Sequence, residues 1–226
     1  MNAARTGNPW AGWVGAFALW LLAFGVLQSL GLDTLEGILY RDGDSLRHIA
    51  TGDLMRAEAT PRPSEPWAFT TEGQDWFNPS WLFNVALSHR YQYGGLWGVT
   101  LFVALLGMLA VALPVLVAGR HGGRFPLTIL LAMLAAPLFL AGIAVRPQVV
   151  TLLLVPLTVA LLWRVQEADR PGKLALVGLV ALAVVWVNAH GGWPVYFTLV
   201  GFWGLGALVA RQNRKFLYFL LTGMIS

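Results

Sequence analysis

The sequence predicts an all-α polytopic integral membrane protein with six transmembrane helices and amphipathic interfacial helices in a large first outer loop. Of the 226 residues, 57% are hydrophobic and only 12% are charged, about half the charged fraction of an ordinary soluble domain. Long stretches of the chain carry no charged side chain at all. Between these stretches, lysine and arginine recur in short clusters, a pattern that orients helices in a bilayer.

The predicted spans follow from the uncharged stretches. About 20 apolar residues in a helix cross a hydrocarbon layer of ~30 Å. Because backbone groups cannot remain unpaired in lipid, each stretch should be helical. Residues 216–226 would cover about half a bilayer at ~1.5 Å per residue, so they mark the start of a seventh span. The six spans are predicted within residues 6–32, 91–119, 125–145, 147–163 and 174–210, the last stretch being divided into two helices at 188–192.

The positions of charged residues predict the orientation of these helices. Nine of the eleven acidic residues fall in the first loop, whereas clusters of basic residues occupy alternate connections. Because positive charge is retained in the cytoplasm, the N-terminus should be cytoplasmic and the first long loop extracytoplasmic. Residues 6–32 then act as a retained signal anchor behind Arg5. The basic residues predicted to be cytoplasmic are Arg5, Arg120, Arg124, Arg164, Arg170, Lys173, Arg211, Arg214 and Lys215.

The first outer loop, residues 33–94, is predicted to fold against the membrane surface within a single membrane domain that covers residues 1–226. A structureless loop of this length is uncommon. Two amphipathic stretches, residues 44–57 and 79–92, flank a proline-rich turn at 61–66, so we expect two short helices lying along the bilayer. The first should turn Leu46, Ile49, Ala50 and Leu54 toward lipid.

The sharpest local signal for chemistry is the pair Asp44 and His48, with Asp42 close by. The two residues are four apart and share a face if the segment is helical. A carboxylate beside an imidazole could hold a divalent metal ion or deprotonate a hydroxyl group. The alternative interpretation is structural, with Asp44 capping a helix that continues into an interfacial ion pair. The spacing alone does not decide between them.

Other candidate residues fall on the same predicted side of the membrane. Arg146 lies between two apolar stretches, where its guanidinium could clamp a lipid phosphate with two hydrogen bonds or simply anchor a helical hairpin. Asn188 and His190 lie at the outer end of the fifth span, as ligands or as part of a helix end at Gly191. Because the topology places all these residues on one side, they could line one pocket.

Several functional classes have no support in the sequence. The chain has no cysteine, so thiol catalysis and cysteine-based metal sites are excluded. It has no P-loop, no dinucleotide-binding glycine pattern and no zinc-protease motif. Nucleic acid is not an expected partner despite the net charge of +4, since the basic residues flank apolar runs. The predicted spans contain little buried charge, which argues against an ion-coupled transporter.

Taken in order, five stretches resemble a known family: residues 42–52 with Asp42-Gly43-Asp44, the proline-rich turn leading to 67–70, residues 76–82 with Trp76, Arg146-Pro147-Gln148, and Asn188-Ala189-His190. In these stretches the chain resembles the bacterial polytopic membrane proteins related to GT-C glycosyltransferases. Such enzymes transfer sugars from polyprenyl-phosphate donors on the outer side of the membrane. They are commonly much longer, so the chain is expected to correspond to an N-terminal half.

The resemblance implies a GT-C-like fold in the bacterial inner membrane and roles for particular residues. Asp44, with Asp42 and His48, would act as the base or as a metal ligand, and Arg146 would hold the donor phosphate. Gln148, Asn188, His190 and Trp76 would join the substrate site. The alternative is a noncatalytic subunit or scaffold of a larger membrane complex, whose apolar faces pack against partner proteins.

Overall fold

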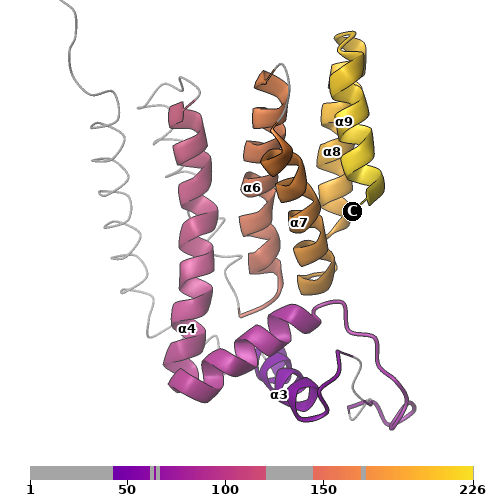
Figure 1. Ribbon diagram of the computed structural model, residues 1–226. Helices are drawn as coiled ribbons and strands as arrows, with labels where there is room; N and C mark the ends of the chain where they lie inside the picture. Colours follow the sequence, from indigo (N-terminus) through magenta and orange to yellow (C-terminus); the bar gives the residue numbers. More distant parts are fainter. Residues whose placement is uncertain (1–42, 62–63, 65–66, 121–144, 169–171, 226) are drawn as a thin grey trace, which may run out of the picture.

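The computed structural model describes residues 43–61, 64, 67–120, 145–168 and 172–225, and its regular elements over these ranges are helices. Figure 1 shows α6 to α9 and the long part of α4 standing side by side, while α3 and the start of α4 lie across one end. The prediction of an all-α fold is confirmed for the described residues. The helices are α3 (Gly43–Ala57), α4 (Trp81–Arg120), α6 (Gln148–Glu167), α7 (Lys173–Ala189), α8 (Pro194–Val209) and α9 (Asn213–Ile225).

The prediction of six transmembrane helices is wrong. Within the part of the chain that the structure describes, two helices are long and apolar enough to cross a membrane, Trp81–Ala118 and Gln148–Glu167. The stretch 174–210 instead forms α7 and α8, of 17 and 16 residues. At ~1.5 Å per residue these helices rise roughly 24–26 Å, short of a ~30 Å hydrocarbon layer. The predicted span at 6–32, and nearly all of that at 125–145, lie outside the described residues.

The two long apolar helices indicate that the chain associates with a membrane. The predicted break in the last long stretch is confirmed, because α7 ends at Ala189 and α8 begins at Pro194. Proline suits this first helical position, where a backbone N–H would have no partner. The apolar residues after 216 form part of α9, a helix of 13 residues that packs on α8.

A bend divides α4 into two parts. Gly95 has φ 56° and ψ −147°, a conformation outside the helical region that glycine adopts without a Cβ clash. Gly98 lies on the inside of the bend, where an added Cβ would come 2.3 Å from the carbonyl oxygen of Arg90. Residues 81–94 therefore lie across the end of the bundle, and the rest of α4 runs along it (Figure 1). The helix predicted over 79–92 is confirmed, with its first residue at Trp81.

α3 packs closely against the first part of α4. An added Cβ on Gly52 would come 2.1 Å from the carbonyl oxygen of Asn84, so the two backbones almost touch there. Residues further along α3 bond to residues further along α4, which shows that the two helices run in the same direction. These contacts join His48 to Asn84, Asp53 to Ser88, and Arg56 to Gln92.

The helix predicted over 44–57 is confirmed, but Ile49, which was assigned to its lipid-facing side, lies in the interior. Ile49 is only 5% exposed and belongs to a core cluster with Phe83 and Leu87 of α4. Leu46, predicted to be on the same face, is 49% exposed. The buried side of α3 is chosen by its contact with α4, so the apolar pattern of α3 alone did not reveal it.

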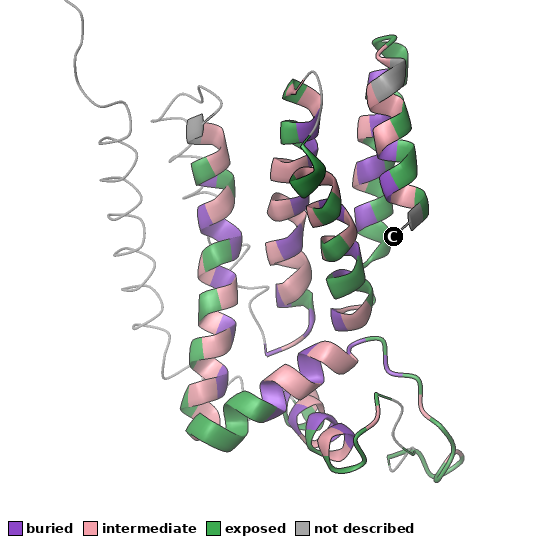
Figure 2. Cartoon of the chain, in the orientation of Figure 1, coloured by how far each residue is buried: buried purple, intermediate pink, exposed green. Residues whose placement is uncertain are grey.

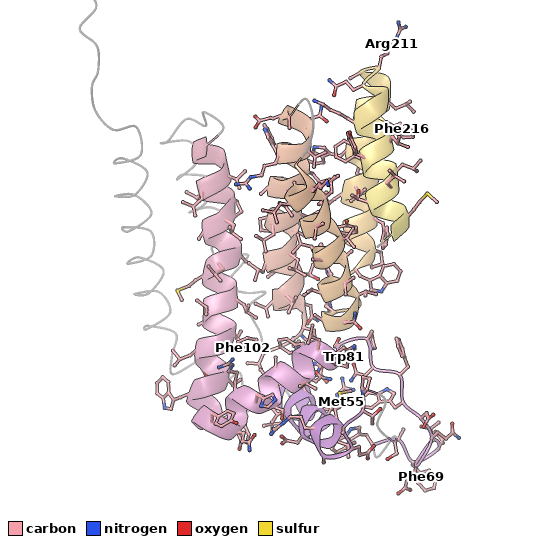
Figure 3. All side chains as sticks on the ribbon, viewed as in Figure 1. Met55, Phe69, Trp81, Phe102, Arg211 and Phe216 are labelled. Carbon is pink, nitrogen blue, oxygen red and sulfur yellow. The ribbon has the colours of Figure 1, made fainter. Side chains whose placement is uncertain are left out.

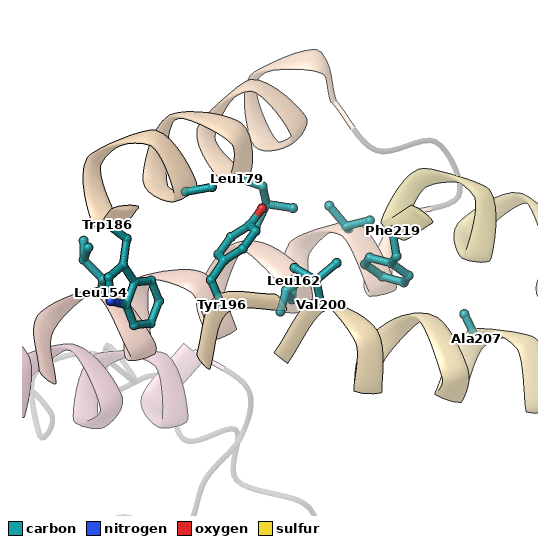
Figure 4. Close-up of a cluster of buried hydrophobic side chains, with 10 residues drawn as sticks. Leu154, Leu162, Leu179, Trp186, Tyr196, Val200, Ala207 and Phe219 are labelled. Carbon is teal, nitrogen blue, oxygen red and sulfur yellow. The ribbon is translucent and has the colours of Figure 1, made fainter. Parts of the chain in front are cut away.

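Two apolar clusters hold the helices together. The first joins α3, both parts of α4 and the start of α6, and the second joins α6, α7, α8 and α9, with Val150 packed against both. In the second cluster, shown in Figure 4, the side chains of Trp186 and Tyr196 are fully buried and meet edge to face, with ring centroids 6.4 Å apart. Outward faces of the helices and most of the connection after α3 are exposed (Figure 2).

Candidate functional site

An ion pair joins α3 to the segment that precedes α6. Arg146 Nη2 lies 3.2 Å from Asp44 Oδ2, and Arg47 Nη2 lies 3.4 Å from the other carboxylate oxygen of Asp44. Asp44 is in the first turn of α3, and Arg146 stands just before Gln148, the first residue of α6. The side chains of Asp44 and Arg146 are 42% and 40% exposed, so the pair is open to solvent or to a ligand.

His48 lies one turn along α3 from Asp44 and faces α4. Its Nδ1 is 2.8 Å from Asn84 Oδ1, and its ring meets Phe83 edge to face, with centroids 5.9 Å apart. An amide oxygen can only accept, so Nδ1 carries the proton in this bond and Nε2 has a free lone pair in the neutral ring. Burial lowers the pKa of His48 below its ordinary value, which outweighs the raising effect of the Asn84 bond. The imidazole is therefore neutral at pH 7.

Two buried polar atoms of α3 and α4 have no hydrogen-bond partner among the described residues. They are Ser45 Oγ and Asn84 Nδ2, and both residues are fully buried. A buried donor without a partner costs about 1–3 kcal/mol. The Asn84 oxygen is occupied by His48, so the arrangement fixes the histidine at the expense of the amide nitrogen.

A second group of predicted residues surrounds the turn between α7 and α8. The Trp186 indole donates to Thr151 Oγ1 at 2.8 Å, and the Thr151 hydroxyl donates to His190 Nδ1 at 2.7 Å. The backbone N–H of Gly192 also donates to His190 Nδ1, at 3.1 Å. Nδ1 is thus an acceptor and Nε2 carries the proton. Burial lowers the pKa of His190, in agreement with a neutral ring.

The second group is linked to α4 through Asn188. The indole N–H of Trp81, the first residue of α4, donates to Asn188 Oδ1 at 2.7 Å. The Asn188 amide nitrogen donates to the carbonyl oxygen of Val184, one turn earlier in α7. Figure 3 shows Trp81 at the end of α4 that lies nearest to α7. The oxygen of Asn188 therefore joins α4 to α7, whereas its nitrogen is used within α7.

The predicted site residues thus form two groups, not one. Asp44, His48 and Arg146 come together on α3 and the start of α6. Asn188 and His190 belong to the second group, which is bonded to Trp81 of α4 and to Thr151 of α6. Gln148 is exposed at the N-terminus of α6, and Trp76 is half-buried in the connection before α4. Asp42 lies outside the described residues.

Asp44 and His48, the residues predicted to bind a metal ion, have other partners in the structure. No group of three His, Asp or Glu side chains that could hold a metal ion occurs among those residues. Asp44 and His48 supply two candidate ligands, but each oxygen of Asp44 already faces an arginine. A cation would have to displace both ion pairs, and the two guanidinium groups would repel it.

Asn84, Thr151, Trp81 and Trp186 were not predicted as site residues from the sequence. Asn84 and Thr151 carried a signal that could have been used, because each places a polar side chain inside an otherwise apolar helical stretch. Such a group needs a partner when buried. The two tryptophans gave no such signal, since the chain has 11 tryptophans and most suit a membrane interface equally well. No protein-family model, curated protein or solved structure matches the chain.

Proposed function

We propose that the chain is a GT-C-like membrane protein that binds a polyprenyl-phosphate sugar beside Asp44, His48 and Arg146. This proposal places α3 and the start of α4 on the outer side of a bacterial inner membrane that the chain crosses more than once, with the N-terminus in the cytoplasm. The observation that carries it is the exposed Arg146 guanidinium, held by Asp44 next to the neutral imidazole of His48.

Arg146 is the group proposed to bind the phosphate. A guanidinium matches a phosphate with two parallel hydrogen bonds, which makes the contact both strong and directional. Arg146 also precedes the N-terminus of α6, which has no side-chain cap and carries partial positive charge. Gln148 is exposed at the same place and can donate from its amide.

Asp44 is proposed to position Arg146 until a phosphate arrives. An ion pair with both side chains about 40% exposed contributes roughly 0–1 kcal/mol to stability, because water screens it. A phosphate can therefore replace Asp44 at little cost to the fold. This role differs from the expected one of base or metal ligand, since both carboxylate oxygens face arginines.

His48 is the residue that could accept a proton in a transfer reaction. In such a step the acceptor hydroxyl would form a bond to the sugar C1, and the bond from C1 to the phosphate oxygen would break. The hydroxyl proton would pass to His48 Nε2, and polyprenyl phosphate would leave on Arg146. A neutral imidazole with Nδ1 held by Asn84 is suited to that role.

Binding of polyprenyl phosphate tests the proposal. The full chain would be purified in a mild detergent, and bound polyprenyl phosphate and protein partners would be identified by native mass spectrometry. Arg146→Ala should lose at least about tenfold in retained polyprenyl phosphate, since it removes a charge-assisted hydrogen-bonding pair. Arg164→Ala is the matched control, because Arg164 is an exposed arginine in the last turn of the same helix.

Two results would contradict the proposal. Equal retention of polyprenyl phosphate by wild type and Arg146→Ala would remove Arg146 from the site. Stoichiometric protein partners without any polyprenyl lipid would favour the noncatalytic subunit. If the lipid is bound at Arg146, a sugar-transfer assay comparing wild type with His48→Gln tests the proton acceptor.

A further inference from the structure

A separate groove lies on the inside of the α4 bend. It has a volume of about 480 Å³ and is lined by residues from both parts of the helix, with Arg90 and Tyr93 before the bend and Leu101, Phe102 and Leu105 after it. None of these residues belongs to either group described above. The groove exists because Gly95 turns the chain and Gly98 lets the second part approach the backbone of Arg90.

One end of the groove is cationic. Arg90 is exposed, and its guanidinium carbon lies 5.9 Å from the centre of the Phe102 ring, so the ring holds the charge in place. The ion pairs found among the described residues involve Arg47, Arg56 and Arg146, and none of them neutralises Arg90. The phenol of Tyr93, which is 82% exposed, stands beside it as a further hydrogen-bond donor.

The other end of the groove opens onto an apolar stripe. Leu101 and Leu105 are 66% and 51% exposed, and Leu109 and Leu116 continue the same face of α4. At ~1.5 Å per residue, the stripe from Leu101 to Leu116 is about 22 Å long, which is more than one leaflet of a ~30 Å hydrocarbon layer. Figure 3 shows Phe102 near the bend of α4.

We propose that this groove binds one anionic phospholipid. Its phosphate lies on Arg90 and Tyr93, and one acyl chain runs along Leu101 and Leu105. The charge of the groove favours an anionic headgroup, because the positive choline of a zwitterionic lipid would lie close to the guanidinium. If residues 81–94 lie along the membrane surface and the rest of α4 enters the bilayer, the bend at Gly95 puts Arg90 at the depth of a lipid phosphate.

Competition between two lipids tests this proposal. The full chain would be exchanged into detergent containing equal amounts of dioleoylphosphatidylglycerol and dioleoylphosphatidylcholine, and retained lipid would be counted by native mass spectrometry. Wild type should retain phosphatidylglycerol about tenfold more than phosphatidylcholine. Arg90→Ala should abolish this preference, and Arg90→Lys should restore only part of it because a lysine lacks the planar fork. Arg164→Ala should behave as wild type.

Three outcomes overturn the proposal: equal retention of both lipids by wild type, an unchanged preference in Arg90→Ala, or loss of the preference in Arg164→Ala. Arg90 is exposed, so Arg90→Ala should fold, and its circular dichroism spectrum checks this. The proposal does not depend on the proposed function. Arg146→Ala should keep the phosphatidylglycerol preference, whereas Arg90→Ala should keep polyprenyl phosphate, so that either proposal can fail alone.

Discussion

His48 and Asp44 are neighbours on α3, but their surroundings give them different chemistry. Asp44 is partly exposed and lies between two arginines, whereas His48 is partly buried and bonded to an amide oxygen. The sequence left open whether Asp44 belongs to a catalytic pair or to an ion pair at a helix start. The structure contains the ion pair, with Arg47 three residues along. The residue free to take a proton is therefore the histidine.

The stability of the protein should depend on pH through His48. Burial lowers its pKa in the folded chain, so below about pH 6.5 the unfolded chain binds the proton more readily. Stability should be full above pH 6.5 and fall as the pH decreases from there toward the lowered pKa. Thermal unfolding in detergent between pH 5 and 8, followed by circular dichroism, measures this loss.

His48→Gln should reduce that loss, because glutamine has no proton to gain. Part of the slope should remain, since burial also lowers the pKa of His190. A slope identical to that of wild type would show that His48 contributes no linkage and would remove the argument that its ring is held neutral.

At the scale of elements, the contact between α3 and the first part of α4 forms the floor of the candidate site. The sequence predicted both ends of α3 and the start of α4 to within two residues, because the apolar periodicity and the prolines define them locally. It did not predict their parallel packing, which depends on which faces meet. Nor did it predict the bend, since Gly94 and Gly95 occur in a chain with 25 glycines.

Gly52→Ala should destabilise the protein by about 1–3 kcal/mol, as expected when a methyl group is forced into a packed contact. The neighbour that would have to move is the Asn84 backbone, 2.1 Å from the new Cβ, and a backbone cannot rotate away as a side chain can. Chemical denaturation in detergent, followed by circular dichroism, gives the free energy of unfolding.

Gly43→Ala is the control for this substitution. Gly43 begins the same helix, and a Cβ there would meet no atom within 4 Å. Its stability should equal or slightly exceed that of wild type, because alanine favours helix more than glycine does. If both variants lose the same free energy, the close approach of α3 and α4 is not what Gly52 provides.

At the scale of the whole molecule, composition predicted the membrane class and the helical fold but not the number of spans. Whether an uncharged stretch makes one long helix or two short ones depends on where the chain turns. The stretch 174–210 was long enough for two spans, yet the turn at 190–193 leaves each helix below the thickness of a bilayer. The predicted topology likewise put the candidate residues on one side of the membrane. Their division into two groups depends on the hydrogen bonds of Asn84 and Thr151.

Trp81→Phe tests how far the two groups are coupled. The substitution removes the indole N–H that binds Asn188 Oδ1 and keeps an aromatic ring, so the expected loss is about 1 kcal/mol of unfolding free energy. If the bond between Trp81 and Asn188 also fixes how the two groups lie relative to each other, polyprenyl-phosphate retention at Arg146 should fall in this variant. Unchanged stability would mean that water replaces the indole, and the two ends of the site would then be independent.

The parallel packing of α3 and α4 has a consequence for the segment between them. The chain must return along the whole of α3, roughly 22 Å, before α4 can begin beside its start. About seven extended residues at ~3.3 Å each would cover that distance. The connection between Ala57 and Trp81 has 23 residues, of which Phe69 is 96% exposed. The surplus makes this segment the place where insertions, epitope tags or a grafted recognition loop can be accommodated without repacking the helices beneath.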